Sequence, residues 1–194
     1  MNEQRRAFSA IPTICATISA NRLRVIMKAV LALFWQICLL RSGPEQVPTA
    51  NWFIGAVIIL NLLCSAALSL SLDTTGDVLS IITRQVVTQA TNAALLWLVL
   101  YLRELSQRFP ASVTALFGCD LIITLCFGAL VPLVNALGDG GSSFIFLGFL
   151  IWSVAVAGFI VHRAMNVTLG IGIFIAVSMM ILSVATSEVA VNPI

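Results

Sequence analysis

Two ionisable residues, Arg84 and Asp120, lie inside long apolar runs of the sequence. A charged side chain in a bilayer is costly unless it is relieved, so such residues mark proton, ion or substrate sites. Counted from the ends of their runs, Arg84 lies about 10 Å deep from one side and Asp120 about 15 Å deep from the other. The depths differ by only about 5 Å in a hydrocarbon core of about 30 Å. We therefore predict that Arg84 and Asp120 face one another, as a site for a proton, an ion or a partner helix.

A structural role is the alternative for both residues. In that case the Arg84 side chain extends to the outer lipid headgroups, and Asp120 is protonated or bonded to a backbone group. Mutation would separate the two interpretations. A lost proton- or solute-dependent phenotype at unchanged protein level in Asp120→Asn and Arg84→Gln would favour function, whereas a lowered protein level in both would favour structure.

Further polar side chains form a stripe along the run over residues 78–102. Two adjacent rows recur at helical spacing, namely Arg84, Thr88 and Thr91 in one and Gln85, Gln89 and Asn92 in the other. Such a stripe points away from lipid, where Asn61 and Asn135 could join it. The alternative is hydrogen bonding that only holds the helices together. The candidate intramembrane polar site therefore comprises Arg84, Gln85, Thr88, Gln89, Asn92 and Asp120.

No other set of residues has the types and spacing that catalysis, cofactor binding or metal binding requires. His162 is the only histidine, and the five cysteines are spread singly without a C-x-x-C pair. The sequence also lacks a paired-histidine metal motif and the glycine-rich fingerprints of nucleotide-binding sites. We therefore predict no catalytic, cofactor-binding or metal-ligating residues and interpret the protein as non-enzymatic.

The amino-acid composition indicates whether these residues lie in water or in a lipid membrane. Hydrophobic residues make up 60% of the 194-residue chain and charged residues only 9%, with a formal net charge of +2. Soluble domains carry about 25% charged residues. The sequence therefore excludes a water-soluble globule, a disordered chain and a nucleic-acid-binding protein, and it predicts one integral membrane domain.

Five apolar runs have the length, about 20 residues, that an α-helix needs to cross a bilayer. Helices are expected because backbone polar groups in lipid must be satisfied within the segment. We predict an all-α polytopic membrane bundle of five transmembrane helices over residues 49–186. The runs are Trp52 to Leu72, Val78 to Leu102, Ala111 to Leu137, Ser143 to Val161 and Ala164 to Ala185.

Local signals refine the bundle. Residues 138–142 are interpreted as a flexible turn, and His162 and Arg163 as the connection between the last two runs. Pro132 should kink the third run. Small residues predict close helix contact, within the chain or with a partner. They are Ser153, Ala157 and Gly158 in the fourth run and Gly170 and Gly172 in the fifth.

The segment before the first run differs from the rest. We predict a flexible N-terminal segment over residues 1–21, then a cytoplasmic interfacial helix and a proline-containing linker over residues 22–48. Apolar residues recur there at helical spacing with Arg24 and Lys28 on the other side, which is typical of a helix in the headgroup plane. A short buried or re-entrant helix is the alternative. Met27 is an alternative first residue, and a short outer tail is predicted over residues 187–194.

The placement of charge predicts the orientation. With the N-terminus in the cytoplasm, all ten Lys and Arg residues except Arg84 fall on the cytoplasmic side. The opposite side receives Asp73, Asp77, Asp139 and Glu188. Because basic loops stay cytoplasmic during insertion, we predict that the N-terminus is cytoplasmic and the C-terminus lies outside.

The residues before and across the spans carry a resemblance to a known family. The segment Leu33-Phe-Trp-Gln-Ile-Cys-Leu-Leu-Arg-Ser-Gly-Pro-Glu-Gln-Val-Pro48 leads into five closely spaced spans and a very short outer tail. Over residues 27–186 this layout resembles the Yip (Ypt/Rab-interacting) membrane proteins, more closely their small bacterial members. The resemblance implies a non-enzymatic protein of the bacterial inner (cell) membrane. It would bind or organise other membrane proteins, or copies of itself, through helix contacts in the lipid bilayer. The alternative from another class is a small transporter or proton-linked subunit that uses Arg84 and Asp120.

Overall fold

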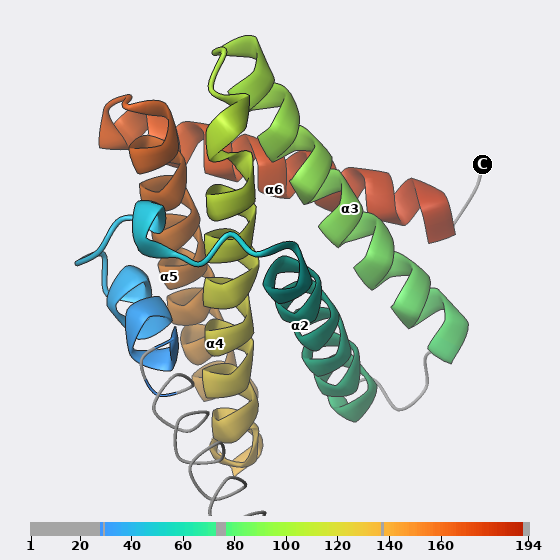
Figure 1. Ribbon diagram of the computed structural model, residues 1–194. Helices are drawn as coiled ribbons and strands as arrows, with labels where there is room; N and C mark the ends of the chain where they lie inside the picture. The colour runs from blue at the N-terminus through green and yellow to red at the C-terminus, as the bar shows by residue number, and fades with distance from the viewer. Residues whose placement is uncertain (1–27, 29, 73–76, 137, 192–194) are drawn as a thin grey trace, which may run out of the picture. The chain divides into compact units, whose positions relative to one another are not determined.

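The computed structural model describes residues 28, 30–72, 77–136 and 138–191, and nearly all of them are helical. Two short 3-10 helices, η1 (Pro44–Gln46) and η2 (Ser106–Arg108), accompany five long α-helices (Figure 1). No strand occurs in the described part of the chain, and the predicted all-α class is confirmed. The long helices are α2 (Asn51–Leu72), α3 (Val78–Leu102), α4 (Phe109–Ala136), α5 (Gly138–Met165) and α6 (Leu169–Val191).

All five long helices are long and apolar enough to cross a membrane, and they define an integral membrane protein. Large apolar side chains on them remain exposed, among them Leu79, Phe144 and Phe174. Water-soluble monomers rarely expose extended apolar surface of this kind, whereas lipid contacts it without cost. Of the predicted runs, the first two agree closely with α2 and α3.

Three predicted boundaries are wrong. Residues 138–142 are helical and begin α5 instead of forming a flexible turn. His162 and Arg163 lie in the last turn of α5, and the connection to α6 lies at residues 166–168. The last helix, α6, ends at Val191 and not at Ala185, the predicted end of the fifth run. Glycine costs a helix only about 1 kcal/mol per residue, which is less than the cost of unsatisfied backbone groups near lipid. The helices therefore continue through polar and glycine residues, and α4 also continues through Pro132.

Three helices end with the same backbone geometry. The residue after the helix adopts a positive φ, and the next N–H donates to the carbonyl group five residues earlier. This Schellman motif satisfies carbonyl groups at the helix end. The residues with positive φ are Leu40, Glu104 and Asn166. The corresponding hydrogen bonds join Arg41 to Gln36, Leu105 to Leu100 and Val167 to His162.

The contact between α5 and α6 depends on glycine. A Cβ atom on Gly158 would lie 2.8 Å from the Cα atom of Ile173, and one on Gly172 would lie 2.9 Å from the Cβ atom of His162. Backbones approach this closely only where a side chain is missing. The predicted small-residue contact is therefore within the chain at these two positions. A Cβ atom on Gly170 would meet nothing within 4 Å.

Residues 34–38, at the end of a short helix over residues 30–38, pack against α4 and α5. Phe34, Ile37 and Cys38 are buried. A Cβ atom on Gly118 of α4 would overlap the Phe34 ring, and Trp152 of α5 donates a 3.0 Å hydrogen bond to the Cys38 carbonyl oxygen. One face of residues 34–38 therefore packs on the bundle while Trp35 stays 45% exposed, and the placement of this segment relative to the headgroup plane stays a prediction. The segment predicted over residues 1–21 lies outside the described residues.

Candidate functional site

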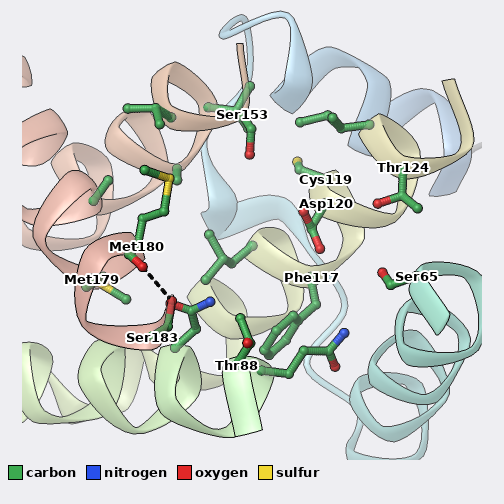
Figure 2. Close-up of a pocket in the computed structure, with 18 of the residues that line it drawn as sticks. Ser65, Thr88, Phe117, Cys119, Asp120, Thr124, Ser153, Met179, Met180 and Ser183 are labelled. Atoms are coloured by element: carbon green, nitrogen blue, oxygen red, sulfur yellow. Dashed lines mark hydrogen bonds between the residues drawn. The ribbon is translucent and has the colours of Figure 1, made fainter. Parts of the chain in front are cut away.

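A cavity of about 350 Å³ lies among the long helices, and each of the five contributes to its wall. Figure 2 shows polar side chains from different helices around the same space. They are Ser65 of α2, Thr88 of α3, Asp120 of α4, Ser153 of α5 and Ser183 of α6. Apolar groups such as Phe117 and Val156 complete the wall. Water-sized volume lined by polar groups inside a membrane domain indicates a site for a polar solute, an ion or water.

Asp120 is held in the wall by a side chain that is itself fully buried. The Asn61 side chain, 0% exposed, donates one Nδ2 hydrogen bond of 3.0 Å to Asp120 Oδ2 and another of 3.0 Å to the Phe117 carbonyl oxygen. Ser65 donates to Asn61 Oδ1 over 3.0 Å. All the polar atoms of the Asn61 amide group are thus used, and its orientation is determined by its neighbours. Asn61 therefore positions one oxygen of Asp120.

Asp120 itself lines the cavity. Within the described residues, no basic side chain forms an ion pair with Asp120, and no Lys, Arg or His lines the cavity. An ionised carboxylate away from water needs a compensating positive charge. A proton or a bound cation can supply that charge here.

Gln89 supplies a second polar group that is not satisfied. Its side chain is 7% exposed and lines the cavity. Its Nε2 atom is buried and finds no hydrogen-bond acceptor among the residues that the structure describes. An unpaired buried donor costs about 1–3 kcal/mol. A water molecule in the cavity would supply the acceptor that this donor lacks.

Four residues of the predicted polar stripe form one face of α3 toward the cavity. Gln85, Thr88, Gln89 and Asn92 all line it, and their spacing of i, i+3, i+4 and i+7 defines a single helix face. Together with Asp120, five of the six candidate site residues meet at one cavity. Whether they serve a function stays a prediction.

The predicted pairing of Arg84 with Asp120 is wrong. Arg84 pairs with Glu188 of α6, with Nη1 and Oε1 3.0 Å apart and Nη2 donating to Oε2 over 3.3 Å. The two side chains are 50% and 46% exposed. Because α6 extends past its predicted end, it supplies an acid close to Arg84. Arg84 is therefore held by α6 and does not line the cavity.

The segment before α2 packs against the part of α4 that carries Asp120. Cys119 lines the cavity and is buried. Its thiol lies 3.9 Å from the Phe34 carbonyl oxygen, while the Cys38 thiol lies 3.8 Å from the Cys119 carbonyl oxygen. These contacts fix residues 34–38 next to the turn of α4 that carries Asp120.

Several cavity residues were not part of the predicted site. Asn61, which holds Asp120 without lining the cavity itself, was named only as a contributor, and its spacing of four from the cavity residue Ser65 is the signal that links the two on one face. The same spacing places Thr124 above Asp120 on α4. Ser153 and Ser183 are single small polar residues in apolar runs, which carry no comparable pattern. The Asn135 side chain lies outside the part of the molecule that the structure describes.

The described side chains contain no group of three or more His, Cys, Asp or Glu residues placed to hold a metal ion. Comparison with known proteins adds no relative. No protein-family model matches the chain, and the comparisons with curated proteins and with solved structures give no match.

Proposed function

We propose that this integral membrane protein is non-enzymatic and binds a small cation or a proton at Asp120 in its intramembrane cavity, as a small transporter or a proton-linked subunit would. The observation that carries the proposal is the Asp120 carboxyl group. It is held by Asn61, has no basic neighbour among the described residues and borders a cavity of about 350 Å³.

The chemistry is an exchange of positive charges at one carboxyl group. When a cation enters, the proton leaves Asp120 and the charge of the site is unchanged. When the cation leaves, a proton returns to the same oxygen atoms. Acidic residues in membrane-spanning helices serve as proton relays and ion sites for this reason.

Organising other membrane components, as the Yip-like resemblance implies, is the other function that the sequence predicts. Helix contacts would carry it, but Gly158 and Gly172 are already used between α5 and α6. The cavity gives the binding of a solute a specific location, and we therefore favour it. A bacterial inner membrane with the N-terminus in the cytoplasm remains the proposed setting.

Proteoliposomes with a trapped pH dye would test the exchange. Vesicles with an acidic lumen receive external tetramethylammonium chloride, a cation that cannot itself carry a proton. We expect the lumen pH to rise with wild-type protein and with Arg84→Gln, whose side chain lies outside the cavity. Asp120→Asn should abolish the rise. A wild-type trace equal to that of protein-free vesicles, or to that of Asp120→Asn, would contradict the proposal.

A further inference from the structure

Resting on the proposed function, we infer that the cation bound at Asp120 carries an apolar alkyl or aryl group, which occupies a second pocket between α4 and α5. The cavity and this second pocket adjoin each other and offer two chemically different halves. One half recognises positive charge, and the other excludes water.

The second pocket adjoins the main cavity directly. It has a volume of about 160 Å³ and shares Leu68, Ile123 and Thr124 with the cavity wall. Thr124 lies one helical turn after Asp120, so about 6 Å along the axis of α4 separates them. A molecule with its charge at Asp120 can therefore extend past Thr124 into the second pocket.

The walls of the second pocket are apolar and aromatic. Beyond the shared residues it is lined by Phe127, Phe146, Phe149 and Leu150. Phe127 packs edge-on against Phe149 and Phe146, with ring centroids 5.3 and 6.3 Å apart. Phe146 is 59% exposed, so the pocket borders the lipid-facing surface of the bundle.

The cavity at Asp120 and the apolar second pocket together indicate the chemical class of the ligand. Asp120 would repel an anion, and no basic residue lines either pocket in the described part of the chain. A small inorganic cation would leave the aromatic pocket unused. An organic cation with an apolar group would use both, because burial of that group adds hydrophobic stabilisation and aromatic contact.

Three probes separate charge recognition from apolar recognition. Calorimetric titration of the full chain in lipid nanodiscs would compare benzyltrimethylammonium, tetramethylammonium and neutral benzyl alcohol, with empty nanodiscs as the blank. We expect benzyltrimethylammonium to bind at least about tenfold more tightly than tetramethylammonium, since each buried methylene contributes about fourfold. Benzyl alcohol should bind more weakly than benzyltrimethylammonium.

Two variants on α5 locate the apolar half. Leu150→Trp fills the second pocket, and Leu147→Trp is its matched control, because Leu147 is exposed and lines neither pocket. Leu150→Trp should remove the preference for benzyltrimethylammonium and retain tetramethylammonium binding, while Leu147→Trp should retain both. If Leu150→Trp fails to fold, Phe149→Ala should reduce the same preference by removing the aromatic wall.

The outcomes distinguish the inference about the second pocket from the proposed function. Equal affinity for the two cations, or a preference that Leu150→Trp leaves intact, would overturn the inference while the proposed function stands. Binding of benzyl alcohol as tight as that of benzyltrimethylammonium would also overturn it, because the pocket would then hold a neutral apolar group. If no cation binds and no lumen pH change occurs, the proposed function fails as well.

Discussion

At the scale of single residues, the site combines one polar side chain whose hydrogen bonds are all made within the protein with polar side chains that line the cavity. Asn61 bonds to Ser65, Phe117 and Asp120, which leaves no polar atom of that side chain for a ligand. Asp120 accepts from Asn61 through Oδ2 and lines the cavity, and the buried Gln89 Nε2 atom has no partner in the described structure. The fully bonded Asn61 is therefore structural, and the two residues that line the cavity are the candidates for binding.

Asn61→Leu should destabilise the protein more than Ser65→Ala. Leucine removes three hydrogen bonds and leaves the buried Phe117 carbonyl group without this donor, which costs about 1–3 kcal/mol for the lost partner alone. Ser65→Ala removes one hydrogen bond, worth about 0.5–1.5 kcal/mol. Thermal unfolding in detergent measures both. Equal melting temperatures for the two variants would show that Asn61 does not hold Asp120.

Gln89→Met should raise the melting temperature of the ligand-free protein. Methionine has a similar length and removes the buried Nε2 donor that lacks an acceptor, so the desolvation cost of about 1–3 kcal/mol disappears. Thr91→Val, on the same helix but outside the cavity wall, serves as the control and should change stability little. A lower melting temperature for Gln89→Met would mean that the amide group is satisfied in the folded protein.

At the scale of helices, close contact between α5 and α6 positions the walls to which Ser153 and Ser183 belong. Gly172→Leu should therefore unfold or mispack the bundle, since its side chain would collide with the Gly158 carbonyl group and with His162. Gly170→Leu is a matched control on the same helix, because a Cβ atom there meets nothing within 4 Å. Monodispersity in size-exclusion chromatography and the melting temperature would report the difference. Normal behaviour of Gly172→Leu would contradict the contact.

At the scale of the whole molecule, the proposed topology follows from the distribution of basic residues. A reporter enzyme that is active only outside the cytoplasm should be active when fused after Ile194. The same reporter inserted between α3 and α4, next to Arg103 and Arg108, should be inactive. The opposite pattern would reverse the orientation, and activity at both positions would mean that the number of spans is even between them.

Much of the architecture could be predicted from the sequence because lipid restricts a chain more than water does. Backbone groups that cannot bond to solvent form helices wherever the side chains are apolar for about 20 residues. The periodicity of Gln85, Thr88, Gln89 and Asn92 likewise predicted a polar face, and these residues do line one cavity. Helix ends were harder to predict, because Gly138, His162 and Glu188 are polar or small residues that a helix still tolerates.

The sequence by itself therefore determined the membrane class, the helices and the polar face of α3, since composition and periodicity are local properties. The tertiary structure alone decided which side chains meet. Counting residues from the helix ends places Arg84 and Asp120 at similar depths in the membrane. Even so, Arg84 pairs with Glu188 and Asp120 bonds to Asn61. Which neighbour a residue contacts depends on how helices rotate and cross. Close packing between residues far apart in the chain, such as Phe34 and Gly118, settles this.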